Sequence, residues 1–322
     1  ETLPASEART LLEQVGVGYG LTLPLRGHAR TVGALTLLLR DEEPPSERAL
    51  LTAHQVADRI GVALDNARMF DQQRQLAEGL QRSLLTAPVQ PPDAEIVVRY
   101  TPAAEAARVG GDWYDAFVQP SGATMLVIGD VVGHDTEAAA SMGQLRSLLR
   151  GVATYSDAEP AEVLRGLDRA MAQLQLGTYA TAAVARFEQT EQERARGVVR
   201  MRWSNAGHLP LLVIHPDGAL AELGEWQGDL LLGVDHAAPR RESVVALQRG
   251  TTVLMFTDGL IERRVGDLDS GMALLRDTAE QLADRPLDEL CDEIIEQLVQ
   301  GQPEDDVALV AIRLRARPGR RD

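Results

Sequence analysis

The pattern of apolar and polar positions changes character near residue 90. From residue 94 onward, short apolar runs separated by polar turns predict eight strands, at 95–100, 123–128, 180–187, 198–205, 211–214, 244–247, 251–256 and 307–314. Apolar residues at helical spacing predict helices over 136–151 and 160–176 and in the region 274–300. Most of the strands follow one another without an intervening helix, which is typical of an antiparallel α+β architecture. The polar segment 188–196 is expected to be a solvated hairpin loop.

The first 40 residues predict part of a small α/β domain. Apolar runs at 20–26 and 32–39 predict two strands joined by a polar turn. Two strands do not make a stable sheet by themselves. Either further strands precede Glu1 or a partner completes the sheet, and a chain that begins with Glu rather than Met is expected to be a fragment of a larger protein.

A long helix is predicted from Ser46, its expected N-cap, to Leu85, shortly before the helix-breaking Pro88. At 1.5 Å per residue it would be about 60 Å long. Its apolar residues recur at steps of three and four, the spacing of a coiled-coil seam, at Leu50, Ala53, Ala57, Ile60, Leu64 and Ala67 and then at Leu76, Leu80 and Leu84. The seam could pack against its own domain or pair two chains. Small alanine side chains favour close helix approach, so we expect a homodimer joined through this helix.

Composition narrows the class of protein. Hydrophobic residues make up 44% of the 322 residues, which excludes a disordered chain and provides a core large enough for two domains. The net charge of −16 argues against nucleic acid or an anionic membrane surface as a partner. The single cysteine, Cys291, lies in a helical apolar stripe and excludes a disulfide framework or a thiolate zinc site. No apolar run has membrane-spanning length and no secretory signal opens the chain, so the cytoplasm is the expected location.

Four acidic turns are the candidates for chemistry. They contain Asp112 with Asp115, then Asp130, then Asp258, and finally the pair Asp305 and Asp306. Each turn alone is more typical of a strand cap, but carboxylates at the ends of several strands can converge on one point. Oxygen ligands without a thiolate or a histidine cluster favour Mg²⁺ or Mn²⁺ over zinc. Two such ions can lower the pKa of a bridging water and make it a nucleophile at neutral pH.

Five motifs occur together along the second part of the chain. They are Gly-Gly-Asp-Trp-Tyr-Asp at 110–115, Gly-Asp-Val-Val-Gly-His at 129–134, Asn-Ala-Gly-His at 205–208, Thr-Asp-Gly-Leu-Ile-Glu at 257–262 and Asp-Asp-Val-Ala-Leu-Val at 305–310. With these motifs in this order, the chain closely resembles the metal-dependent serine/threonine phosphatases of the PP2C (PPM) type, specifically the bacterial SpoIIE/RsbU-like branch. The resemblance covers roughly residues 80 to 315, which is most of the chain. The resemblance implies a PP2C-like antiparallel β-sandwich flanked by helices.

The resemblance also implies a centre for two Mn²⁺ or Mg²⁺ ions. Its ligands would be Asp112, Asp130, the carbonyl of Val131, Asp258 and Asp305. Asp130 would bridge the ions, and Asp130 and Asp258 would be the catalytic carboxylates. The implied reaction is in-line attack of a metal-bridged hydroxide on phosphoserine or phosphothreonine, without a covalent enzyme intermediate. The usual substrate in this branch is a phosphorylated anti-sigma-factor antagonist of the STAS type, and an upstream sensor controls the activity.

A second resemblance covers the first part of the chain. The segments Val32–Leu37 and Ala63–Phe70 resemble the last strands and the final helix of a GAF sensory domain, of which only the C-terminal half is present. We therefore expect a partial GAF-like domain at 1–70, a helical linker at 71–90, the phosphatase domain at 91–315 and a disordered tail at 316–322.

Several positions leave alternatives open. Asp135 stands where many relatives have glycine, and it could N-cap the following helix or lie near the metals and alter their number or affinity. His134 and His208 could be proton donors, although satisfied loop histidines are commoner. Asp305 rather than Asp306 is the expected ligand because it matches the family's position.

Two other functions compete with a protein phosphatase. One is a sensory scaffold that binds its partner without turnover. The other is a phosphohydrolase of small molecules or nucleotides, which the lack of a glycine-rich phosphate cradle and an aromatic content of only 4% make less favourable.

Overall fold

The computed structural model describes residues 16–40, 43–84, 87–103, 110–133, 136–224, 229–262, 267–299, 301, 303 and 305–315, with the backbone alone at 73–78, 80–84 and 136. The chain forms two compact units, Glu1–Gln75 and Leu76–Asp322. The tail at 316–322, which was expected to be disordered, lies outside the described residues. Within the described ranges, no helix is both long and apolar enough to cross a membrane.

The first unit contains the predicted hairpin and the start of the predicted helix. β1 (Tyr19–Arg26) pairs with β2 (Thr31–Leu39) in an antiparallel two-stranded sheet. The helix α2 (Glu47–Leu84) begins where the Ser46 hydroxyl accepts a hydrogen bond from the backbone N–H of Ala49 at 3.3 Å. The predicted N-cap and the predicted extent of this helix are therefore confirmed.

Part of the predicted seam of α2 packs inside this unit. Ala57 is buried, and Ala53 and Ile60 pack beside it against apolar side chains of the hairpin. Gly61 permits this close approach, because a Cβ there would lie 2.4 Å from a backbone oxygen at the end of β1. Leu64, by contrast, is 37% exposed. Packing against its own domain therefore accounts for the seam from Ala53 to Ile60, and a dimer would have to use other residues of the helix.

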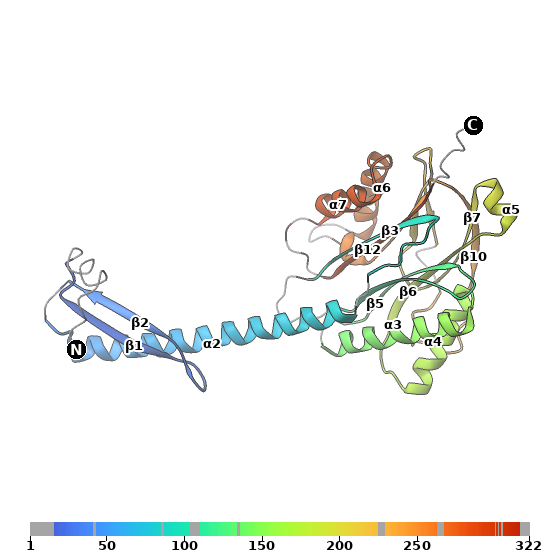
Figure 1. Cartoon of the computed structure of the whole chain (residues 1–322). Helices are drawn as coiled ribbons and strands as arrows, with labels where there is room; N and C mark the ends of the chain where they lie inside the picture. The colour runs from blue at the N-terminus through green and yellow to red at the C-terminus, as the bar shows by residue number, and fades with distance from the viewer. Residues whose placement is uncertain are drawn as a thin grey trace. The chain divides into compact units, whose positions relative to one another are not determined.

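The second unit is built on two five-stranded sheets in which all neighbouring strands are antiparallel (Figure 1). The first has the order β10-β7-β6-β5-β4 and consists of β4 (Asp112–Val118), β5 (Thr124–Val131), β6 (Ala180–Glu188), β7 (Val198–Ala206) and β10 (Ser243–Gln248). The second has the order β3-β12-β11-β8-β9 and consists of β3 (Ala94–Thr101), β8 (Leu211–Ile214), β9 (Leu220–Leu223), β11 (Thr252–Phe256) and β12 (Val307–Leu314). All eight predicted strands are present, and the predicted antiparallel α+β architecture is confirmed.

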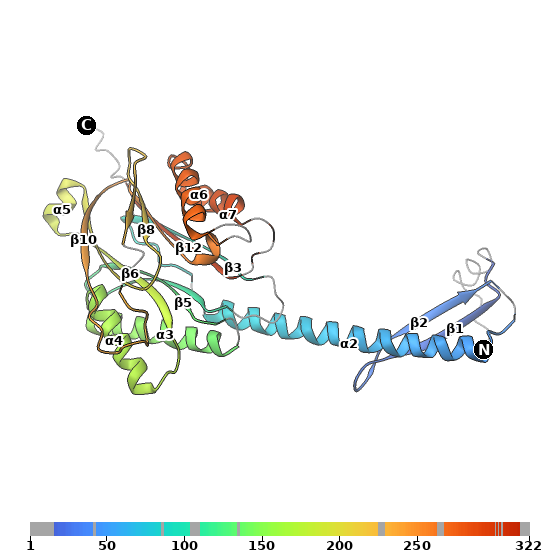
Figure 2. The same cartoon turned by 180° about the vertical axis from the view of Figure 1, so that it is seen from behind.

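Helices cover the outer face of each sheet, as Figures 1 and 2 show from opposite sides. α3 (Thr136–Ser156) and α4 (Pro160–Leu174) pack on the first sheet, and α6 (Leu268–Gln281) and α7 (Leu287–Leu298) pack on the second. Successive side chains of a strand point to opposite faces, so each strand contributes to two apolar layers. In β5, for example, Ile128 packs in the layer between the sheets, whereas Val127 packs against α3 and α4. Cys291 lies on the buried face of α7 in this outer layer, as the apolar stripe of that helix predicted.

Three local predictions were wrong or incomplete. The expected loop at 188–196 contains the short helix α5 (Glu191–Arg196), because Thr190 and Glu193 form a capping box that the run of charges concealed. The helical region 274–300 is two helices, the second of which starts after Pro286. The strands β4 and β9 were not predicted. In β4 two buried positions, one on each face of the strand, are aspartates, which hides the apolar pattern.

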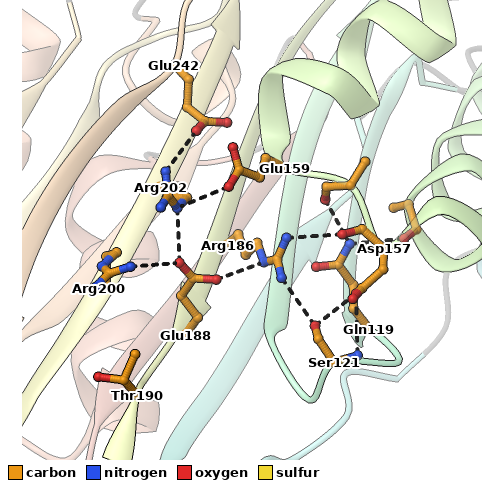
Figure 3. A network of polar contacts seen from close by, with 12 residues as sticks. Gln119, Ser121, Asp157, Glu159, Arg186, Glu188, Thr190, Arg200, Arg202 and Glu242 are labelled. Carbon is orange, nitrogen blue, oxygen red and sulfur yellow. Dashed lines mark hydrogen bonds and ion pairs between the residues drawn. The ribbon is translucent and has the colours of Figure 1, made fainter. Parts of the chain in front are cut away.

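A polar network ties the strands of the first sheet together at the end away from the acidic motifs (Figure 3). Arg186 of β6 donates to the hydroxyl of Ser121 at 3.2 Å and pairs with Glu188 at 3.3 Å. Arg202 of β7 pairs with Glu188 at 3.0 Å and with Glu242, just before β10, at 3.2 Å. These contacts cross-link neighbouring strands at one end of the sheet. The strand ends that carry the acidic motifs, at the other end, thus belong to strands that are held together.

Candidate metal and active site

The strands β4 and β5 bring the first two carboxylates together. Asp112 is the first residue of β4 and pairs directly with Asp130, near the end of β5. Paired residues of antiparallel strands have their side chains on the same face, so the two carboxyl groups are neighbours. Gly111 is required beside them, because a Cβ there would lie 2.3 Å from the carbonyl oxygen of Val131 and 3.0 Å from Asp130 Oδ1.

The second sheet supplies the other predicted carboxylates. Asp258 opens a 3-10 turn (Asp258–Leu260) that follows β11, and Asp305 comes shortly before β12. β11 and β12 are antiparallel neighbours, so the end of one and the start of the other lie at the same edge of the sheet. Gly259 packs closely there, since a Cβ on it would lie 2.1 Å from the carbonyl oxygen of Asp306. The Asp-Gly turn is therefore needed for the approach of the two acidic segments.

Asp130 and Asp258 line one cavity of about 260 Å³, although they come from different sheets. The other lining residues are Thr181, Gly207, His208, Leu209, Pro210 and Leu268. Asp112 pairs with Asp130 in register, Val131 follows Asp130 in sequence, and Asp305 lies near enough to Asp258 for its charge to act on it, but none of the three lines the cavity. The structure thus brings the two predicted catalytic carboxylates to one place, where the ends of the two sheets meet.

Burial and mutual repulsion raise the pKa values of these carboxyl groups. Burial and then the charge of Asp130 raise the pKa of Asp112 well above its usual range. Burial and then the charge of Asp258 raise the pKa of Asp130 to about 7. The pKa of Asp258 is raised by burial and then by Asp305. Like charges at close range disfavour ionisation, so the site holds more negative charge than it can keep without a compensating cation.

The donor set fits a hard divalent cation. Asp112 Oδ2 is buried and has no hydrogen-bond partner, which costs free energy unless something else satisfies it. Oxygen donors select Mg²⁺ or Mn²⁺. In the part of the chain that the structure describes, no three His, Cys, Asp or Glu side chains lie close enough together to form a metal site by themselves.

Asp306 has a different role from its neighbour Asp305. Asp306 is buried and accepts hydrogen bonds from the hydroxyl of Tyr100 and from the N–H of Ala103, the latter at 2.8 Å. The N–H of Asp306 donates to Asp305 Oδ1 at 2.8 Å, while Asp305 itself is exposed. These contacts favour Asp305 as the ligand and make Asp306 an anchor between β3 and β12. The role of Tyr100 as a hydrogen-bond donor to Asp306 was not predicted, because its only distinguishing feature in the sequence is its place at the end of a predicted strand.

His208 is a buried and neutral histidine. Its Nε2 lies 3.1 Å from the carbonyl oxygen of Phe256, so Nε2 carries the hydrogen and Nδ1 accepts one from the Thr181 hydroxyl at 2.7 Å. Burial lowers the pKa of His208 to about 4. The side chain of Asn205 accepts a hydrogen bond from the His208 N–H at 2.6 Å, which explains the Asn-Ala-Gly-His motif. The geometry favours a satisfied histidine over a proton donor. Thr181 is a further residue of this site that sequence reasoning missed.

Residues 120–315 match the family model described as Stage II sporulation protein E (SpoIIE). The chain belongs to the SpoIIE family. This is a family of PP2C-type (PPM) phosphatases, and the match covers more than half of the chain. The SpoIIE match includes Asp130, Asp258 and Asp305, whereas Asp112 precedes it.

Solved structures agree with the SpoIIE assignment. The RsbU and RsbW domains of Rv1364c from Mycobacterium tuberculosis are 37% identical with a TM-score of 0.61, over 71% of this chain and 62% of that chain, so this chain spans less than two thirds of that relative. The SiaA-PP2C domain of Pseudomonas aeruginosa is 20% identical with a TM-score of 0.61, over 78% of this chain and 98% of that one. The PP2C phosphatase domain of SpoIIE from Bacillus subtilis, with a fragment of its regulatory domain, is 15% identical with a TM-score of 0.56, over 69% and 63%. The last two show a shared PP2C-like fold.

Predictions for two parts of the chain stay untested. The match begins at residue 120, so the GAF-like character of the first part stays a prediction. His134 and Asp135 lie outside the described residues, and the alternatives for each remain as the sequence left them.

Proposed function

We propose that this SpoIIE-family chain is a metal-dependent protein phosphatase that hydrolyses phosphoserine or phosphothreonine on a signalling protein. The observation that carries the proposal is the convergence of Asp130 and Asp258 on one cavity from two different sheets. Carboxylates that are buried together and repel one another suit a cation site and serve no purpose in a passive scaffold.

Two Mn²⁺ or Mg²⁺ ions are the proposed cofactors. Asp112, Asp130, the carbonyl of Val131, Asp258 and Asp305 would hold them. When bound, such ions lower the pKa of a coordinated water and offset the charge of a phosphate group.

The surrounding residues suit this chemistry. Bound ions would offset the charge of a phosphate group that enters the cavity between Asp130 and Asp258. Nearby positive charge lowers the pKa of a carboxyl group, so Asp130 and Asp258 would act as oxygen donors and not as proton carriers. His208 stays neutral and keeps Thr181 in place, because its one ring N–H is committed to Phe256.

We further propose that the substrate is a phosphorylated STAS-domain anti-sigma-factor antagonist. The support is the similarity to a protein in which an RsbU domain occurs with an RsbW domain. In this scheme the chain is cytoplasmic, residues 1–70 are the C-terminal half of a GAF-like sensory domain, 71–90 a helical linker and 91–315 the phosphatase domain. The linker would pass the sensory signal to the phosphatase and join two chains in a homodimer.

Hydrolysis of p-nitrophenyl phosphate tests the proposal. We expect turnover by purified protein with added Mn²⁺ or Mg²⁺, no turnover after EDTA treatment, and no rescue by zinc. Full activity of the metal-free protein would refute the metal site. A protein that binds Mn²⁺ but turns over neither p-nitrophenyl phosphate nor a phosphorylated STAS domain would favour the sensory scaffold.

A further inference from the structure

Two hydrogen bonds of the His208 side chain link the two sheets at the candidate active site. On one side, its Nδ1 accepts a hydrogen bond from the hydroxyl of Thr181, in β6 of the first sheet, at 2.7 Å. On the other side, its Nε2 donates to the carbonyl of Phe256, the last residue of β11 in the second sheet, at 3.1 Å. We name these three residues the cross-sheet brace. Thr181 and His208 both line the cavity that Asp130 and Asp258 share.

Each end of the cross-sheet brace lies beside a predicted metal ligand. Thr181 stands directly opposite Asp130 in the β5–β6 register, so their side chains lie on the same face of the first sheet. Phe256 precedes Asp258 by two residues, and the turn that contains Asp258 begins shortly after β11. The brace therefore joins the strand that pairs with Asp130 to the strand that leads into Asp258.

The bond to Phe256 takes the place of a hydrogen bond between strands. The N–H of Thr257, just beyond β11, donates to the carbonyl of Ala308 in β12 at 3.0 Å. Successive residues direct their backbone groups to opposite neighbours, so the carbonyl of Phe256 points toward β8. Continuing the β11–β8 register places Pro210 opposite Phe256, and proline has no N–H to donate. The ring of His208 supplies the donor that this position of the sheet lacks.

The backbone that carries the His208 ring is itself fixed. The side chain of Asn205 accepts a hydrogen bond from the His208 N–H at 2.6 Å and donates to the carbonyls of His208 and Leu209 at 2.8 and 3.2 Å. Gly207 lies in the left-handed region with φ at +70°, and a Cβ there would lie 2.9 Å from the side chain of Leu231. The turn is therefore closely packed, and the ring cannot shift without breaking the bonds to Asn205.

Asp130 and Asp258 carry like charges that repel one another before a cation is bound. A link that holds their strands together lowers the free-energy cost of presenting both carboxylates to the cation. Because His208 is neutral, the link adds no positive charge that would compete with the cation. We propose that the cross-sheet brace sets the separation of Asp130 and Asp258 and thereby the affinity for the divalent cations. Thr181 and His208 are then positioning residues, and this inference rests on the proposed metal-dependent function.

Calorimetric titration of the metal-free protein with Mn²⁺ measures this role without turnover. Thr181→Val removes the hydroxyl and keeps the shape of the side chain, and we expect the Kd for Mn²⁺ to rise about tenfold. Thr181→Ser keeps the hydroxyl and should retain most of the affinity. The control Thr278→Val removes a buried hydroxyl that bonds to Gln297 at 3.3 Å between α6 and α7. It should lower Tm without changing the Kd.

Two further measurements separate positioning from a loss of stability. In Thr181→Val, the Mn²⁺ concentration that gives half-maximal hydrolysis of p-nitrophenyl phosphate should rise in parallel with the Kd. At saturating Mn²⁺, kcat should stay near the wild-type value, because every proposed ligand remains. His208→Asn keeps an acceptor near Thr181 but is too short to reach Phe256. Since the brace fails when either end is broken, Thr181→Val with His208→Asn should weaken Mn²⁺ binding no more than the stronger single replacement.

Several outcomes would overturn the positioning role. An unchanged Kd in Thr181→Val, with or without a lower Tm, would leave its hydroxyl a contact that serves stability alone. Binding losses that add in the double variant would show that the two residues act separately. Equal losses in Thr181→Ser and Thr181→Val would assign the effect to packing. A wild type that binds Mn²⁺ without hydrolysing p-nitrophenyl phosphate would instead contradict the proposed phosphatase function, and the Kd values would still decide the role of the brace.

Discussion

The ion pair between Asp168 and Arg240 allows a quantitative test of how the segment beside the active site is held. The two side chains are 1% and 0% exposed, and Nε and a terminal nitrogen of Arg240 both lie 2.8 Å from Asp168 Oδ2. The guanidinium also donates to the carbonyls of Leu230 and Leu231, and Asp168 Oδ1 accepts from the N–H of Gly233 at 3.4 Å. One buried pair thus fixes the segment 229–234 to α4.

Replacing Asp168 by Asn leaves the Arg240 guanidinium buried without a counter-charge. Breaking a buried pair from one side costs about 3–5 kcal/mol. At about 2–4 °C per kcal/mol for a domain of this size, Tm should fall by roughly 6–20 °C. The matched variant Asp168→Leu with Arg240→Met removes both charges and fills the space with apolar side chains. We expect it to be more stable than either single replacement, because it leaves no unpaired charge.

Urea unfolding followed by tryptophan fluorescence measures the double-mutant cycle of Asp168→Leu, Arg240→Met and the two replacements together. Trp113 is fully buried in the layer that contains α4 and reports its loss. We expect a coupling of at least about 2 kcal/mol between Asp168 and Arg240. Single variants within about 0.5 kcal/mol of the wild type, or a double variant whose loss equals the sum of the single losses, would refute the reasoning.

Further predictions address the carboxylates, the buried histidine and the helix. Asp130→Asn and Asp258→Asn should each lower turnover of p-nitrophenyl phosphate at least about 100-fold with an unchanged circular-dichroism spectrum; near wild-type rates with unchanged Mn²⁺ content would show that the assignment is wrong. Burial holds the pKa of His208 at about 4, below the 6.5 of the unfolded chain, so the unfolded state binds more protons and stability is lost as the pH falls. Between pH 7 and pH 5 the wild type should lose about 2 kcal/mol more than His208→Asn in urea unfolding, and equal losses would contradict this. Leu64→Glu, at a seam side chain of α2 that is 37% exposed, should convert the proposed dimer into monomers in light scattering, and a wild type that is monomeric at high micromolar concentration would contradict the dimer.

The sequence predicts strands where apolar residues alternate or run on without interruption. β5 and β12 were predicted for this reason, and both are almost entirely buried. β4 was missed because Asp115 occupies a buried position in it. That burial depends on Arg146 and Arg150 of α3, which lie 3.1 and 3.2 Å from the carboxylate. A partner more than thirty residues away leaves no local pattern to detect.

The sequence predicted the carboxylates of the site but not the contacts that hold the site in position. Asp130 and Asp258 stand in recognisable motifs, and the structure places both on one cavity. The bond between Tyr100 and Asp306 and the bond between Thr181 and His208 each join a strand to a segment distant in the sequence. Sequence motifs indicate the reacting groups, whereas the contacts that position them come from the tertiary fold.

The origin of Asp130 and Asp258 in different sheets has a consequence for the whole sandwich. A cation held by both carboxylates would connect the two sheets across the apolar layer between them. The affinity of the site for the cation would therefore depend on how well the two sheets pack together. Shortening a side chain in that layer, such as Ile128 or Met255, would weaken metal binding without altering a ligand. By the same linkage, metal in excess would raise the melting temperature of such a variant, and added Mn²⁺ would partly repair a defect in the core.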